Sequence, residues 1–148
     1  MKLRRPLAVL PLAAALLAAC SPLNHLAGDG TPAKRLDGRW AVRYVAGQEI
    51  PAPYPELDFD GAAGTLGGSD GCNRLRGRFS LEDGRLQAHT ASTRMACLND
   101  AAARTSAAIH TLLGQGAEVV ETTVGAGRGL LIRNGGAEIR LVPVGGQR

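Results

Sequence analysis

The chain has 148 residues, enough for one domain, and its formal net charge is +4. Lys2, Arg4 and Arg5 supply three of these charges, so the remaining chain is nearly neutral and gives no indication of nucleic-acid binding. Apolar residues make up 45% but aromatic residues only 3%, so the core must be aliphatic, and the 20 glycines suit a turn-rich β protein.

Residues 1–19 have the pattern of a lipoprotein signal peptide. Basic residues precede the apolar run 6–17, which is too short to span a bilayer comfortably. Leu17-Ala18-Ala19-Cys20 resembles a bacterial lipobox, which implies that Cys20 is lipidated after cleavage and anchors the chain to the membrane. The alternative is an ordinary secreted protein with an incidental cysteine. Ser21, rather than Asp, follows the cysteine, so we expect a periplasm-facing protein of the bacterial envelope, in the outer membrane.

Three segments follow the signal peptide. Residues 20–35 are polar, rich in Gly and Pro and without periodicity, so they are predicted to be a lipidated cysteine with a flexible tether. Residues 36–144 carry the periodic patterns of a folded domain, and residues 145–148 form a tail.

Alternating apolar residues predict strands in the first part of the domain. In residues 39–45, Trp40, Val42 and Tyr44 fall on one face, and in residues 56–60 Leu57 and Phe59 do so. Gly, Pro, Asn and Asp mark the loops and corners between strands. The further predicted strands, with a Gly-containing hairpin turn between the last two, are 65–68, 77–81 and 85–88.

One helix is predicted after this set of strands. Asn99 or Asp100 is a natural N-cap, Gly114 suits the C-terminal cap, and the run between them carries a narrow apolar stripe. Strands are expected at 117–121, 129–133 and 137–142, the last two joined at Asn134-Gly135. This order predicts an α+β fold, a curled antiparallel sheet or partial barrel with one main helix. The stripe consists of Thr105, Ser106, Ile109, Leu112 and Leu113.

The two cysteines of the domain are predicted to form a disulfide. With Cys20 lipidated, Cys72 and Cys97 remain, an even number in an oxidising compartment. Closing a loop of this length stabilises by about 3.5 kcal/mol in the chain-entropy model. The alternatives are two buried thiols or a metal site, although neither cysteine has the close-spaced partner that zinc sites prefer.

No catalytic, cofactor or metal site is expected. No motif positions His89 or His110 as a base for a Cys72 nucleophile, and no G-x-S-x-G elbow is present. Residues 125–129 lack the Lys-Ser/Thr ending of a phosphate-binding loop and suit a hairpin. Three acids without EF-hand spacing are expected to be solvated turn residues: Asp58, Asp60 and Asp70.

Arginines at alternate positions predict one charged surface. Arg74, Arg76 and Arg78 point to the same face of a strand, and Arg85 on the paired strand extends the row. One interpretation is a solvated outer face. The other is a contact surface for an acidic envelope protein or for lipid headgroups.

Three motifs resemble the META domain family, described as HslJ-like after a heat-shock lipoprotein. They are Leu36-Asp37-Gly38-Arg39-Trp40, Gly71-Cys72-Asn73-Arg74 and Thr93-Arg94-Met95-Ala96-Cys97. The resemblance covers residues 36–142 and implies a small α+β domain, usually exported and often lipidated, with no established enzyme activity. Leu98 stands where members commonly carry a proline.

We therefore expect a non-catalytic, lipid-anchored envelope module linked to stress tolerance, which binds the membrane through Cys20 and another envelope protein or lipid. No nucleic-acid partner is expected, and the sequence predicts no oligomeric state. The alternative is a pilot-type chaperone that holds a lipid or peptide in the partial barrel, an analogy of shape alone. The core distinguishes the two, because a pilot needs an open apolar cavity and a scaffold is filled.

Overall fold

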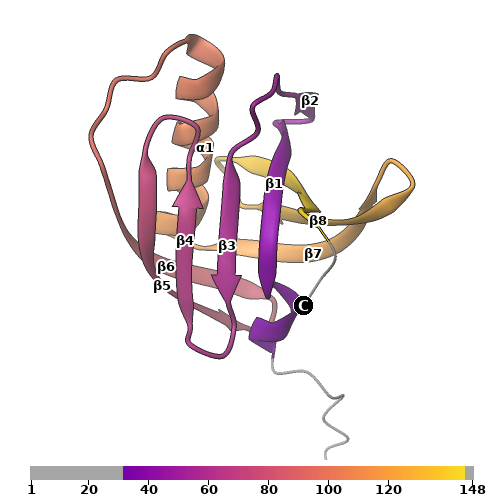
Figure 1. Ribbon diagram of the computed structural model, residues 1–148. Coiled ribbons are helices and arrows are strands. Elements are labelled where there is room, and N and C mark those ends of the chain that lie inside the picture. Colours follow the sequence, from indigo (N-terminus) through magenta and orange to yellow (C-terminus); the bar gives the residue numbers. More distant parts are fainter. Residues whose placement is uncertain (1–31, 146–148) are drawn as a thin grey trace, which may run out of the picture.

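The computed structural model describes residues 32–145, so the predicted signal peptide, Cys20 and most of the tether lie outside the described residues. Within that range the chain forms nine antiparallel strands, one α-helix and one short 3-10 helix, η1 (Figure 1). The elements are η1 (Pro32–Arg35), β1 (Gly38–Val45), β2 (Gln48–Glu49), β3 (Glu56–Asp60), β4 (Thr65–Ser69), β5 (Arg74–Glu82), β6 (Arg85–Ser92), α1 (Asp100–Gln115), β7 (Ala117–Val124), β8 (Gly127–Arg133) and β9 (Glu138–Pro143).

The sheet closes on itself. Neighbouring strands pair in the order β1-β3-β4-β5-β6-β7-β8-β9, and β9 pairs in turn with β1, so eight strands form a closed barrel while the short β2 pairs only with β1. Trp40 of β1 lies opposite Leu57 on one side and Pro143 on the other. The predicted α+β fold with a curled antiparallel sheet and one main helix is confirmed, and the expected partial barrel is in fact complete.

Buried side chains fill the barrel, as expected for an eight-stranded barrel. Most are aliphatic, but three of the few aromatic residues, Trp40, Phe59 and Phe79, also lie in this core, so the expected purely aliphatic core is corrected. The helix α1 packs against β6 and β9, and its predicted stripe is buried. The helix η1 lies at the opposite end in Figure 1 and contacts β5. Beside η1, the indole Nε1 of Trp40 donates a 2.7 Å hydrogen bond to the carbonyl oxygen of Leu36, and both residues are fully buried.

A bulge in β1 changes which residues face the core. The register shifts between Val42 and Tyr44, so that Tyr44 lies opposite the exposed Arg140 while Val45 lies opposite the buried Ile139. The prediction that Tyr44 shares the inner face with Val42 was therefore wrong, and Val45 packs against the core instead. The extra residue of a bulge reverses the alternation that follows it.

The helix begins where the sequence predicts and ends later. The side chain of Asn99 accepts a 2.9 Å hydrogen bond from the backbone N–H of Ala102, which makes it the N-cap. The C-cap is Gly116, with φ of 79°, rather than Gly114. The predicted two-residue turn at Asn134-Gly135 is a four-residue loop, because Arg133 pairs with Glu138 and the Asn134 side chain accepts from two backbone N–H groups inside the loop.

Candidate functional site

A disulfide joins the corner before β5 to the segment before α1. Cys72 and Cys97 are bonded with an S–S distance of 2.02 Å and a Cα–Cα distance of 4.8 Å. The predicted disulfide is therefore present in the structure, and it takes the place of the buried-thiol and metal-site alternatives. It also removes Cys72 as a candidate nucleophile, because a disulfide sulfur carries no thiolate.

The side chain of Asn73 ties the same two segments together. Its Oδ1 accepts hydrogen bonds from the backbone N–H of Met95 at 2.6 Å and from the hydroxyl of Thr93 at 3.0 Å. The Thr93 hydroxyl oxygen in turn accepts from the backbone N–H of Arg74 at 3.1 Å. The motif at residues 71–74 and the motif at 93–97 therefore contact each other, and their residues hold two loops in one arrangement.

Asp70 forms a buried polar clasp between this corner and α1. Its Oδ1 accepts from the backbone N–H groups of Cys72 at 2.7 Å and Asn73 at 2.6 Å. Its Oδ2 accepts from Ser106 Oγ at 3.0 Å and is 2.7 Å from His110 Nε2. Asp70 is fully buried, so its prediction as a solvated turn acid was wrong. Ser106 and His110, four residues apart on one helix face, are the signal that could have revealed it.

The clasp holds an ionised carboxylate. Burial raises the pKa of Asp70, but hydrogen bonds from Asn73, Cys72, His110 and Ser106 outweigh burial and hold this pKa below the usual 3.8. The Ser106 hydroxyl donates to Asp70 and not to His110, whereas a catalytic serine needs the histidine between itself and the acid. The geometry suits a structural connection.

The predicted arginine row lies on the outer face of the barrel. Arg74, Arg76 and Arg78 are exposed on β5 and alternate with positions that face the interior. Arg85 begins β6 and pairs with Glu82, at the far end of the hairpin from Arg74. We call Arg74, Arg76 and Arg78 the β5 arginine row, because Arg85 lies apart from them beside an acid.

Within the described part of the chain, the arginines of the β5 arginine row have no acidic side chain within ion-pair distance, unlike several other arginines of the barrel. No ion pair within residues 32–145 involves Arg74, Arg76 or Arg78. Five arginines on β1, β8 and β9 each lie within ion-pair distance of a glutamate: Arg39–Glu56 at 3.9 Å, Arg43–Glu49 at 2.6 Å, Arg128–Glu121 at 3.4 Å, Arg133–Glu118 at 3.0 Å and Arg140–Glu138 at 3.4 Å.

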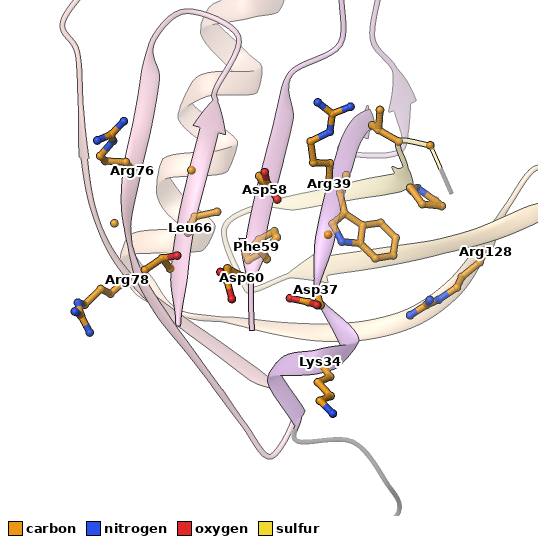
Figure 2. Close-up of a pocket in the computed structure, with 18 residues that line it drawn as sticks. Lys34, Asp37, Arg39, Asp58, Phe59, Asp60, Leu66, Arg76, Arg78 and Arg128 are labelled. Atoms are coloured by element: carbon orange, nitrogen blue, oxygen red, sulfur yellow. The ribbon is translucent and has the colours of Figure 1, made fainter. Parts of the chain in front are cut away.

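An open cleft of about 1370 Å³ lies beside the row (Figure 2). The register places Asp58, Gly67 and Arg76 side by side across β3, β4 and β5. Asp60, Thr65 and Arg78 are aligned in the same way one step along. Adjacent strands are about 4.8 Å apart, so the backbone of β3 at these acids lies roughly 10 Å from that of β5 at the arginines, with Gly67 and Thr65 between them. We call Asp58 and Asp60 the acidic wall of the cleft, and Arg76 and Arg78 its basic wall.

Comparison with known proteins identifies the domain. Residues 33–143 match the family model of the META domain.

The chain belongs to the META domain family.

Two solved structures share the fold of this META domain. One NMR structure has 28% sequence identity and a TM-score of 0.61, covering 76% of this chain and 93% of the other. An NMR structure of a protein from Burkholderia xenovorans has 22% identity and a TM-score of 0.54, covering 74% and 83%. A search of curated protein sequences finds no match.

Two further findings concern residues 32–145 of the META chain. No group of three or more His, Cys, Asp or Glu side chains in that range is placed to hold a metal ion. Neither is any helix there long and apolar enough to cross a membrane.

Proposed function

We propose that this protein is a lipid-anchored protein of the bacterial envelope whose META domain is a non-catalytic contact module linked to stress tolerance. In this proposal Cys20 carries the lipid in the outer membrane, the domain faces the periplasm, and the β5 arginine row contacts an acidic envelope component. The observation that carries the proposal is the unbalanced charge of Arg74, Arg76 and Arg78.

The row has the properties of a preorganised anion-binding surface. β5 is hydrogen-bonded to β4 on one side and β6 on the other, so its backbone is held in place. Alternate positions on a strand are about 6.6 Å apart, which lets neighbouring guanidinium groups engage one extended anionic partner. Arginine presents a planar set of donors that matches carboxylate and phosphate oxygens.

The non-catalytic part of the proposal is supported by the polar groups nearest to the motifs. Cys72 is held in a disulfide, and Asp70 is saturated by four donors. His89, the other histidine considered as a base, lies on β6 opposite Arg78, on the outer face. Such an arrangement offers a rigid surface rather than a nucleophile with its base.

The test of the contact surface is crosslinking of the lipidated protein in intact envelopes, followed by mass spectrometry of captured proteins and lipids. We expect R74S/R76S/R78S to lose the captured component without a change in Tm. The matched control is R104S/R133S/R140S, which removes the same charge elsewhere on the domain. Equal capture by both variants would refute a role for the row, and equal loss of capture and folding would do the same.

The anchor and the stress link are tested in cells. A Cys20→Ser variant is expected to move from the membrane fraction to the soluble periplasmic fraction. A strain without the protein is expected to lose viability under envelope stress, with rescue by the wild type but not by Cys20→Ser. Rescue by the unanchored variant would separate the stress role from the anchor.

The pilot-type alternative has less support. It needs an open apolar cavity in the barrel, whereas the interior contains packed side chains such as Leu57, Leu130 and Leu141, all fully buried. Two open clefts border the outer face of β4 and β5, and the larger of the two also extends over β3 and β1. Addition of a fatty acid followed by NMR tests this alternative. Chemical-shift changes confined to methyl groups of the core would show binding inside the barrel and would favour the pilot-type function over the contact module.

A further inference from the structure

We propose that the acidic component contacted by the β5 arginine row is the phospholipid surface that holds the anchor, and that the domain lies on this surface along β5. The inference rests on the proposed function and names its partner. Headgroups that carry an ammonium beside the phosphate fit the face best. Three features of the structure lead to this assignment.

The first feature is a pair of exposed apolar side chains at one end of the row. Met95 is 68% exposed and Leu98 is 96% exposed, and they are the large apolar residues left uncovered among residues 32–145. Both belong to the segment between β6 and α1, on either side of Cys97. Basic residues next to exposed apolar ones are typical of surfaces that enter the membrane interface.

The structure holds this apolar pair in a defined place. The backbone N–H of Met95 donates to Asn73, the residue immediately before the row, and Cys97 is bonded to Cys72. The backbone N–H of Thr93 donates to the carbonyl oxygen of Arg74 at 3.0 Å. The apolar segment is therefore tied to the Arg74 end of the row, which explains how an exposed leucine keeps a fixed position beside the arginines.

The second feature is the position of the chain end at the other end of the row. The helix η1 contacts β5, and Lys34 lines the same cleft as Arg78. Twelve residues lead from Cys20 to Pro32, and a chain of this length spans at most about 40 Å. β5 itself is about 30 Å long. The anchor, the arginine row and the apolar pair can therefore all meet one membrane surface.

The third feature is the acidic wall of the cleft, which discriminates between headgroups. Asp58 and Asp60 lie on β3, two strands away from Arg76 and Arg78 on β5, and Figure 2 shows the four side chains along the same cleft. A headgroup with only negative charge is attracted by the arginines and repelled by these acids. A phosphoethanolamine headgroup places its phosphate at the basic wall and its ammonium at the acidic wall.

The test is vesicle binding by the mature chain with Cys20→Ser, so that no lipid tail contributes. Vesicles are made of phosphatidylcholine alone, or with phosphatidylethanolamine, or with phosphatidylglycerol. We expect the tightest binding with phosphatidylethanolamine and a loss of at least about tenfold in R74S/R76S/R78S but not in R104S/R133S/R140S. Phosphatidylcholine carries the same phosphate as phosphatidylethanolamine, but its ammonium group has no hydrogen to donate. The comparison of these two lipids therefore tests the contact between the ammonium group and the acidic wall.

The acidic wall and the apolar pair each have their own variant. D58N/D60N is expected to abolish the preference for phosphatidylethanolamine over phosphatidylglycerol, whereas E82Q/D83N, at the hairpin tip, keeps it. M95S/L98S is expected to weaken binding about tenfold without lowering Tm, because both side chains are already exposed.

Fluorescence reports the orientation on the membrane. In Leu98→Trp, the fluorescence emission of the new indole should shift to the blue when vesicles are added and should be quenched by brominated lipid. The emission of the buried Trp40 should change in neither way. Ala126→Trp, at the exposed tip of the β7–β8 hairpin, is the control position and should not respond.

Several results would overturn the inference. These are equal binding by the row variant and its charge-matched control, no effect of M95S/L98S, or a preference for phosphatidylglycerol that D58N/D60N leaves unchanged. If vesicles are not bound but crosslinking in envelopes still depends on the row, the inference fails and the proposed function stands with a protein partner. If both experiments are negative, both fail.

Discussion

The Oδ2 atom of Asp70 lies 2.7 Å from Nε2 of His110 and joins the corner before β5 to α1. These residues are 40 positions apart in the chain, and the acid is fully buried while the histidine is 38% exposed. A charged group in the interior is tolerated only with partners on every side. Asp70 has four hydrogen-bond partners, two on the corner before β5 and two on α1, so its side chain connects the helix to the barrel.

Asp70→Asn should lower the free energy of unfolding by about 3 kcal/mol. The amide keeps only one acceptor oxygen, so its NH2 group would lie against N–H or O–H groups that donate to the carboxylate in the wild type. Ser106→Ala, which removes one of the donors, should cost about 1 kcal/mol. Urea unfolding followed by circular dichroism measures both. Asp83→Asn, in the β5–β6 turn, is the control and should change stability by less than about 0.5 kcal/mol.

The pH dependence of stability should follow the titration of Asp70. Its pKa is lowered in the folded protein, so the unfolded chain binds a proton first as the pH falls. The stabilisation is therefore complete above the ordinary Asp pKa of 3.8 and is lost as the pH drops through the lower folded pKa. Unfolding free energies measured between pH 2 and about 6 should fall more steeply for the wild type than for Asp70→Asn. Parallel curves would contradict the assignment.

Removal of the disulfide should destabilise the domain by about 3.5 kcal/mol in the chain-entropy model. The variant is C72A/C97A in the mature chain with Cys20→Ser, compared by urea unfolding with the chain that retains the bridge. A thiol assay on the denatured, unreduced parent should detect no free thiol, and two reactive thiols would show that the bridge does not form.

Gly77 and Gly67 make a matched pair on neighbouring strands. A Cβ at Gly77 would lie 2.1 Å from the carbonyl oxygen of His89, which is backbone and cannot move away cheaply. At Gly67 the nearest atom is 4.0 Å away. Gly77→Ala should therefore cost on the order of 3 kcal/mol or prevent folding, whereas Gly67→Ala should be tolerated within about 1 kcal/mol. Similar Tm values for the two variants would show that β5 and β6 can separate.

Asn73→Ala should loosen the segment that carries Met95. Loss of the Oδ1 acceptor leaves the backbone N–H of Met95 and the hydroxyl of Thr93 without their bonds, at a cost of about 1–2 kcal/mol. Hydrogen exchange at Met95 should accelerate before that of the barrel strands. Asn73→Asp, which keeps the acceptor, should retain protection, and unchanged exchange in both variants would argue against the role of this side chain.

The sequence was sufficient for features that depend on neighbouring residues. Period-two alternation located β1 and β3, Gly-containing turns located the hairpins β5–β6 and β8–β9, and the Asn99 cap with its apolar stripe located α1, because these patterns arise between neighbouring residues. The alternation of Arg74, Arg76 and Arg78 likewise predicted that they share a face. The number of cysteines led to the disulfide, since only one intramolecular pair remains once Cys20 is set aside.

Features that depend on how distant segments meet appear only in the tertiary structure. The bulge that turns Tyr44 outward follows from pairing with β9, almost a hundred residues later, and the closure of the barrel follows from the same pairing. Burial of Asp70 requires the helix to bring Ser106 and His110 over the corner. The acidic and basic walls of the cleft are brought side by side by the register of β3, β4 and β5. Local sequence determines which way a side chain points along its own element, whereas its partners are decided by segments that packing alone brings together.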